Sequence, residues 1–354
     1  MSIFKQIPIL IGCFTLCCFA SISTDQLSIG GAYLGVFNDF NKKQAQFDYA
    51  TNINIEFDIA ENLSGLVEFQ SSPGNGSLGF EGPSAVVTDI SLFYNLYLNN
   101  HLTKITFGSF DAAFGYETQF LSNNADTFNN LYIINSLTYA ALAGQVGTLN
   151  TLGIQAENKY KYVDLTTSIS NGTSETAYNE NKTFEHLVQF STHSLIDGLR
   201  ITGTYFKSDD SHDARDSFQT NLTAILYEVN YLMLNTFNLK LKKADFIFDD
   251  QNSLTSDRVF SYEIELSYDK DPFFIGCRAS LWRPQGSVSS SDIPNPGLLN
   301  TISGRIDRIQ LTGGIYLKEN IVYKSEVIHE VYDTIAGVNI TKNTGVITGF
   351  NIQF

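Results

Sequence analysis

The chain has 354 residues, a formal net charge of -15 and a mean hydropathy of -0.06. The negative charge argues against nucleic-acid binding, because it would repel the phosphate backbone. Phe and Tyr are frequent (27 and 18) whereas Pro and Met are scarce (7 and 2), which favours strands over helices. Beyond residue 20, no stretch is long and apolar enough for a membrane-spanning helix, but membrane-barrel strands alternate apolar and polar residues and average to a neutral hydropathy.

Residues 1–23 have the features of a secretory signal peptide. Lys5 supplies positive charge, residues 7–19 form a short apolar run, and cleavage sites follow at Cys18-Phe19-Ala20 or Ser21-Ile22-Ser23. The alternatives to a cleaved signal peptide are a buried N-terminal helix and a lipid anchor on Cys17 or Cys18. We expect the remainder, 24–354, to form a single domain.

Cysteine usage is consistent with export. Cys13, Cys17 and Cys18 lie within the predicted signal peptide, and Cys277 is the one cysteine beyond it. No intrachain disulfide and no cysteine metal site are therefore expected in the mature chain.

The first long segment with strict alternation is 47–59. One side carries apolar residues or threonine and the other carries polar or small residues, a pattern that a helix would scatter around its circumference. The apolar set is Phe47, Tyr49, Thr51, Ile53, Ile55, Phe57 and Ile59.

The same pattern recurs along the chain and predicts an even number of strands, sixteen, as a closed bacterial barrel requires. The expected strands are 26–37, 47–59, 63–70, 86–98, 102–110, 146–157, 160–170, 183–192, 199–207, 218–232, 236–248, 258–269, 273–283, 304–318, 321–332 and 344–354.

The connections between these strands alternate between short and long, which is the asymmetry of an outer-membrane barrel with short periplasmic turns and long external loops. Both chain ends then fall on the periplasmic side. The long connections are 71–85, 111–145, 171–182, 208–217, 249–257 and 284–303.

These patterns predict an all-β, transmembrane antiparallel β-barrel. Lipid offers no hydrogen bonds, so every strand must pair along both edges and the sheet must close. Sixteen strands leave a lumen too wide for wall side chains alone to fill, which predicts an aqueous channel.

The last strand ends the chain on an aromatic residue, with Phe350, Ile352 and Phe354 on one face. This segment resembles the C-terminal sorting signal of bacterial outer-membrane barrels, which implies recognition by the barrel-assembly machinery. The alternative is that a domain happens to end in a strand, although such an exposed edge would invite aggregation in a soluble protein.

Two internal segments resemble Gram-negative general porins, the sixteen-stranded outer-membrane barrels. One is FGSFDAAFGYE (Phe107 to Glu117), where a strand passes into the long 111–145 loop, and the other is IYLKENIVYKSE (Ile315 to Glu326). The resemblance implies passive diffusion of small hydrophilic solutes and ions, usually through a homotrimer, and a long third external loop folded into the lumen.

Charge placement suggests a constriction. The 111–145 loop carries Asp111, Glu117 and Asp126 and no base, whereas alternation directs a sector of bases toward the lumen, so that an acidic loop would face a basic wall. The alternative is that all of these are ordinary solvated lumen residues. The basic sector consists of Arg200, Lys240, Lys242, Arg278, Arg308 and Lys324.

Acidic residues also line the predicted lumen, and their excess predicts a weak preference for cations. The dense arginine ladder that phosphate-selective porins use has no counterpart here. The predicted lumen acids are Glu56, Asp58, Glu68, Glu157, Glu228, Glu263, Glu265 and Glu326.

Catalytic and cofactor patterns are lacking in the sequence. The five histidines are scattered and no zinc-protease, phosphate-loop, serine-hydrolase or EF-hand motif occurs, so we expect neither an enzyme nor a cofactor. The acidic segment 209–216 could hold Ca²⁺, although a solvated loop is the simpler interpretation.

Aromatic residues near the strand ends predict the two interfacial girdles of a membrane barrel, in contact with outer-membrane lipid and lipopolysaccharide. Two other functions stay open: a non-conducting structural or adhesive barrel, and a soluble exported β protein. The expected girdle residues are Tyr33, Phe37, Tyr49, Tyr205, Tyr262, Tyr268, Phe273, Phe350 and Phe354.

Overall fold

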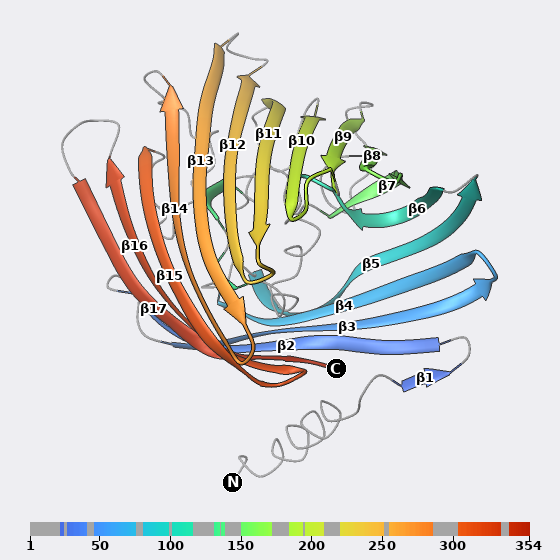
Figure 1. Ribbon diagram of the computed structural model, residues 1–354, viewed down its shortest axis with the longest axis horizontal. Coiled ribbons are helices and arrows are strands. Elements are labelled where there is room, and N and C mark those ends of the chain that lie inside the picture. The colour runs from blue at the N-terminus through green and yellow to red at the C-terminus, as the bar shows by residue number, and fades with distance from the viewer. Residues whose placement is uncertain are drawn as a thin grey trace.

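The structure is a computed structural model that consists almost entirely of β-strands (Figure 1). It describes residues 22–24, 27–40, 46–75, 81–98, 101–115, 131–134, 136–138, 150–171, 184–193, 195–208, 220–250, 255–285, 304–333 and 340–354. Within these ranges, no helix is long and apolar enough to cross a membrane.

Seventeen strands are present in the described chain. They are β1 (Ile22–Thr24), β2 (Leu27–Phe40), β3 (Gln46–Ala60), β4 (Leu63–Asn75), β5 (Glu81–Leu98), β6 (His101–Asp111), β7 (Asn150–Lys159), β8 (Val163–Ser170), β9 (Glu185–Thr192), β10 (Leu199–Ser208), β11 (Thr220–Met233), β12 (Phe237–Asp250), β13 (Thr255–Lys270), β14 (Phe273–Gln285), β15 (Arg305–Lys318), β16 (Ile321–Asp333) and β17 (Ile340–Gln353).

Strands β2 to β17 form a closed antiparallel ring, so the predicted fold class is confirmed. Each strand pairs with its neighbours in sequence, and β17 closes the ring by pairing with β2 from Gly345↔Phe40 to Gln353↔Ala32. In Figure 1 the red β17 accordingly lies beside the blue β2, and the strands run obliquely around the wall. Closure leaves no free edge in the ring, which is the condition that lipid imposes on a spanning sheet.

The short strand β1 lies outside the ring and pairs only with the start of β2, from Ile22↔Ile29 to Thr24↔Leu27. It spans the predicted signal boundary at residue 23. Residues 1–21, which include most of the predicted signal peptide, lie outside the described residues.

All sixteen predicted strands correspond to strands of the ring, and most of their boundaries agree to within a few residues. The largest difference is at β5, which begins at Glu81 instead of 86, and its partner β4 continues to Asn75 instead of 70. The pair is extended by register contacts as far as Asn75↔Glu81, so the predicted 71–85 loop is mostly strand.

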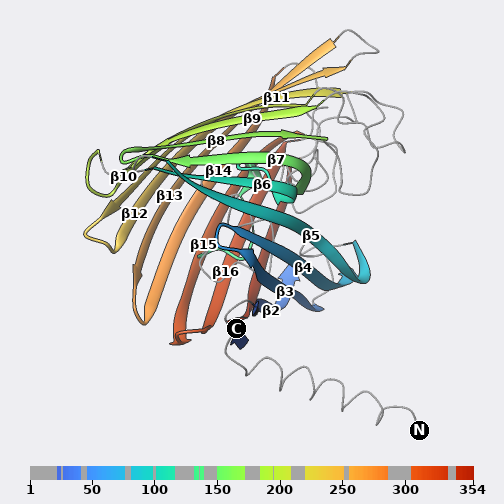
Figure 2. The ribbon, with the colours of Figure 1, turned by 90° about the vertical axis from the view of Figure 1, so that its right-hand side faces the viewer.

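One end of the barrel carries only short turns. These include Glu61-Asn62 between β3 and β4, Asp271-Pro272 between β13 and β14, and Glu319-Asn320 between β15 and β16. The C-terminus lies at this short-turn end beside β2, as Figure 2 also shows, where Gly31 and Phe354 exchange two backbone hydrogen bonds of 2.7 and 2.9 Å. The longest connections lie at the opposite end, which we call the long-connection end.

The outer face of the ring is largely apolar in its middle. On β13, Ile264 and Leu266 are 50% and 54% exposed, while their neighbours Glu263 and Glu265 are buried inside. Aromatic residues pair across strands near both ends: Phe237 with Tyr268 and Tyr323 with Phe350 at the short-turn end, and Phe37 with Phe47 at the other. This is the distribution of a sheet that meets hydrocarbon between two interfaces.

The core of the molecule lies inside the barrel. The chain after β6 turns inward, and its described parts, 112–115, 131–134 and 136–138, are buried against the inner wall except for the half-buried Leu131. The described parts of the long third connection are therefore folded into the lumen, as the resemblance to porins implies.

Candidate functional site: the barrel lumen

The inward segment is held first by an apolar cluster on the wall of β9 to β16. Phe114 is fully buried and its ring lies 6.3 Å from Phe206 and 6.4 Å from Phe246. Trp282 packs 5.5 Å from Phe246 on the same surface. Burial of several aromatic side chains, each with an area of about 150–250 Å², anchors this limb of the loop mainly by hydrophobic contact.

Polar contacts fix the backbone of the same limb. The side-chain amide of Gln189 on β9 donates to the carbonyls of Ala113 and Gly115, at 2.6 and 3.0 Å. Thr204 on β10 accepts the backbone N–H of Gly115 at 3.2 Å. Buried backbone groups that leave a strand need such partners, because unpaired ones cost about 1–3 kcal/mol each.

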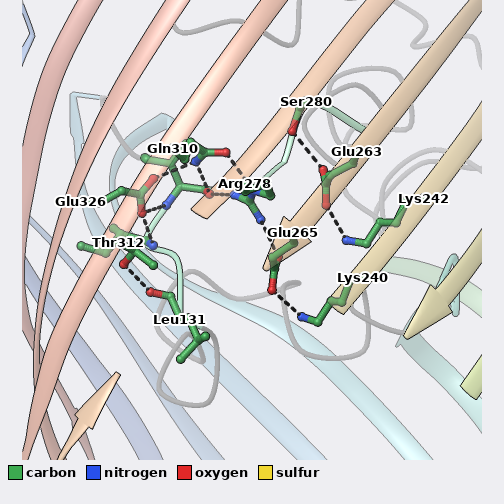
Figure 3. A network of polar contacts seen from close by, with 12 residues as sticks. Leu131, Lys240, Lys242, Glu263, Glu265, Arg278, Ser280, Gln310, Thr312 and Glu326 are labelled. Carbon is green, nitrogen blue, oxygen red and sulfur yellow. Dashed lines mark hydrogen bonds and ion pairs between the residues drawn. The ribbon is translucent and has the colours of Figure 1, made fainter. Parts of the chain in front are cut away.

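A second limb, Leu131 to Ile134, is held by the wall of β14 to β16 (Figure 3). The Glu326 carboxylate accepts the backbone N–H groups of Ile133 and Ile134 at 2.7 and 3.3 Å. Thr312 donates to the Leu131 carbonyl at 2.8 Å. Wall side chains thus replace the strand partners that this irregular segment lacks.

Arg278 lies at the centre of this second contact. Its guanidinium donates to the Ile134 carbonyl at 2.6 Å and to the Gln310 side chain at 2.8 Å. The Tyr132 ring lies 4.0 Å from the guanidinium carbon, in a cation–π arrangement. Burial, with the nearby Glu265 carboxylate, raises the pKa of the Tyr132 hydroxyl, so this ring stays neutral beneath the cation.

Bases of the wall are paired with carboxylates on adjacent strands. Lys242 on β12 lies 2.8 Å from Glu263 on β13, and Lys240 lies 3.1 Å from Glu265. The guanidinium of Arg308 on β15 lies 2.6 Å from Glu330 on β16. The register places these pairs directly opposite one another: Lys242↔Glu263, Lys240↔Glu265 and Arg308↔Glu330.

The predicted basic residues have these positions in the structure. Lys242, Arg278, Arg308 and Lys324 are buried on the inner face, whereas Arg200 and Lys240 are half-buried there. The acids of the same face lie among them, so the sector is a mixed surface of both signs. Among the described residues, seven buried carboxylates face four buried bases.

Of the predicted loop acids, Asp111 belongs to a wall strand instead of the loop, and no described contact involves the other two. Asp111 is the last residue of β6, and Glu117 and Asp126 lie outside the described residues. Their role in a constriction stays a prediction. The acidic segment 209–216 also falls outside the described residues, and within those ranges no group of three or more His, Cys, Asp or Glu side chains could hold a metal ion.

Sequence reasoning missed the apolar half of the lumen. Leu222, Ala224 and Leu226 occupy inward positions of β11, and Phe246 and Phe248 occupy those of β12. Apolar residues at positions of inward parity were the available signal, because a water-filled wall would carry polar residues there. Glu330, the partner of Arg308, was missed as well.

No profile of a protein family and no curated protein sequence matches the chain. Solved structures match it in fold. The anion-selective porin of Comamonas acidovorans superposes with a TM-score of 0.65 at 10% identity, covering 93% of this chain and 99% of the porin. Salmonella typhi OmpF, solved with daunomycin, gives 0.61 at 13% identity, covering 95% of this chain and all of OmpF.

A trimer form of OmpT, an outer-membrane protein of Vibrio cholerae, matches with a TM-score of 0.59 at 8% identity. The match covers 93% of this chain and 99% of OmpT. At these identities the comparisons establish a shared architecture, the sixteen-stranded porin barrel.

Proposed function

We propose that the chain is an outer-membrane porin: a passive diffusion channel for small hydrophilic solutes and ions, with a weak preference for cations. The observation that carries the proposal is the closed sixteen-stranded ring with an apolar outer face and a polar, charged inner face. Inward charged residues that are exposed, such as Glu56 and Asp58, are expected where water reaches the lumen.

The cation preference is supported by the charge of the lumen. Among the buried residues of the described inner wall, seven carboxylates outnumber four bases. The half-buried bases Arg200 and Lys240 reduce this excess of negative charge, and the inward acids Glu56, Asp58 and Glu157 add to it. The predicted loop acids Asp111, Glu117 and Asp126 would add to it. A negative lumen concentrates cations and repels anions, with an effect that decreases as salt screens the charges.

A non-conducting barrel that serves a structural or adhesive role is the second candidate. The apolar packing of Phe114, Phe206 and Phe246 inside the lumen favours it, because this part of the cross-section excludes water. In that case the external loops would carry the function by binding another surface.

Planar-bilayer recording separates these candidates. The purified, detergent-folded protein is expected to produce ohmic conductance steps, with a reversal potential in a KCl gradient that indicates a modest preference for K⁺. A protein that is folded by heat-modifiable gel migration and yet never conducts would overturn the channel proposal in favour of the closed barrel.

The proposed partners follow from the outer surface. The chain would sit among outer-membrane lipid and lipopolysaccharide, with the short-turn end in the periplasm. Outward-facing Lys207, Arg258, Arg283 and Arg305 near the long-connection end would suit the phosphates of lipopolysaccharide. A homotrimer is proposed by analogy with the trimeric Vibrio cholerae protein.

Assembly would use the last strand. Phe350 projects outward and Phe354 lies against Gly31 at the seam, so the proposed sorting signal coincides with the strand that closes the ring. We propose that residues 1–23 are removed on export and that the barrel-assembly machinery recognises Phe350, Ile352 and Phe354.

A further inference from the structure

The inner wall differs from one side of the barrel to the other in how much of it water can reach. On β13, β14 and β16 the inward side chains are buried close to the short-turn end: Ser267, Phe274 and Val322 are 3%, 3% and 0% exposed. The apolar contacts of Leu131 and Tyr316 with Phe274 and Val322 account for part of this burial. Leu131 of the inward loop and Tyr316 of β15 thus help to seal this sector at the short-turn end.

The opposite sector, β3 to β7, is accessible at its short-turn end, whereas Asn52, Glu68 and Gln155 further along its strands are buried. At the short-turn end of β3, the inward residues Glu56 and Asp58 are exposed. On β6 and β7, Lys104 and Glu157 are half-exposed and lie directly opposite each other in the register. Water entering from the short-turn end thus meets these charged side chains first.

The accessible acids are not paired with bases, unlike Glu263, Glu265 and Glu330 on the sealed side. Glu56 lies opposite Ser28 on β2 and Leu66 on β4, both uncharged. Asp58 accepts a hydrogen bond from Ser64 at 2.8 Å. Neither acid forms an ion pair with any residue in the described ranges.

Glu157 is similar. It accepts a hydrogen bond from Gln155 at 3.4 Å, and the Lys104 ammonium opposite it lies 4.1 Å from the centre of the Phe93 ring. Hence three acids (Glu56, Asp58 and Glu157) face the accessible sector. Two bases share it, Lys104 and the exposed Lys159, which has the same inward parity as Glu157, while Lys242 and Arg308 are buried in ion pairs elsewhere.

We propose that Glu56, Asp58 and Glu157 are the residues that determine cation preference, and that ions enter or leave the lumen at the short-turn end on the β3–β7 side. The inference rests on the proposed channel function and deepens it. Accessible, unpaired carboxylates attract mobile cations, whereas a buried ion pair presents almost no net field to an ion in the passage. The selectivity filter is then on the wall opposite the predicted basic sector.

The test is the reversal potential of the triple variant E56Q/D58N/E157Q in planar bilayers under a KCl gradient. We expect the K⁺/Cl⁻ permeability ratio to fall about twofold or more at low salt (about 0.05 M) and to change little near 1 M, where the Debye length is only about 3 Å. The matched control D39N/D249N/E319Q removes three exposed acids that do not face the lumen, and its ratio should equal that of the wild type.

The outcomes are distinguishable. A wild type that does not conduct defeats the channel proposal itself. A conducting triple variant with an unchanged ratio defeats only the assignment of these acids. If the triple variant does not fold, the single variant D58N at the rim serves instead, and it should lower the ratio by a smaller factor; an unchanged ratio there counts against the assignment equally.

Discussion

At the scale of single residues, the lumen is organised by matching charges across neighbouring strands. Alternation along each strand directs Arg308 and Glu330 inward, and the register then makes them direct neighbours. Burying such a pair contributes little net stability, because desolvation offsets the attraction. The removal of one member is different, since the remaining charge stays buried.

The Arg308–Glu330 pair gives the first prediction. Arg308→Met should lower the free energy of unfolding by about 3–5 kcal/mol, because the buried Glu330 carboxylate loses its guanidinium. Urea unfolding in lipid vesicles measures this change. The double variant R308M/E330Q should recover most of the loss, and a single variant as stable as the wild type would contradict the pairing.

At the scale of elements, alternation and turn residues were sufficient to place the strands. The strict alternation of apolar and polar residues in 47–59 predicted β3 (Gln46–Ala60) to within one residue at each end. The start of β5 was missed because Gly82 and Pro83 normally mark a turn, whereas here they extend the hairpin with β4. Strand β1 has only three residues, which are too few for an alternating pattern to be recognised in the sequence.

The inward loop shows where prediction from the sequence ends. Its position was expected from resemblance, but its attachment was not, because the contacts of Ile133 and Ile134 with Glu326 join residues nearly two hundred positions apart. The residues of the predicted basic sector lie on the inner face, but their pairing with Glu263, Glu265 and Glu330 depends on the register between strands. Periodicity within one strand carries no information about that register.

The seam between β17 and β2 gives the second prediction. A side chain at Gly31 would place its Cβ 2.3 Å from the Asn52 carbonyl oxygen and 2.9 Å from the Phe354 ring. Gly31→Val should therefore destabilise the closed ring by about 1–3 kcal/mol and lower the temperature at which heat-modifiable migration is lost.

Gly203→Val on β10 is the matched control, because nothing lies within 4 Å of a Cβ at that position. It should change stability by less than about 0.5 kcal/mol. Equal losses in the two variants would indicate that a general strand effect, and not the crowded seam, determines the cost.

At the scale of the whole molecule, the outer face specifies a membrane as its surroundings. On β13 the outward residues run from Tyr268 through Leu266, Ile264 and Tyr262 to Phe260, and a charge first appears at Arg258. Ten residues at the usual tilt span an apolar slab of about 25 Å. The length of this uncharged run matches that thickness.

The third prediction tests that match by depth. Ile264→Arg, in the middle of the run, should destabilise the folded protein in vesicles by about 2–4 kcal/mol, whereas Tyr268→Arg near the interface should cost about 0–1 kcal/mol. Urea titration of both variants provides the comparison. Equal costs at the two depths would place the apolar slab elsewhere or remove it altogether.

The pairing of the first ring strand with the last has a consequence for biogenesis. The edge of β2 that β17 covers must wait, unpaired, until nearly the entire polypeptide has been synthesised and exported. Contacts of such long sequence separation form slowly, and an open apolar edge meanwhile recruits other chains into aggregates. The unfinished sheet is therefore open to aggregation during that interval, and yield in vivo should be limited by it more than by the stability of the finished protein.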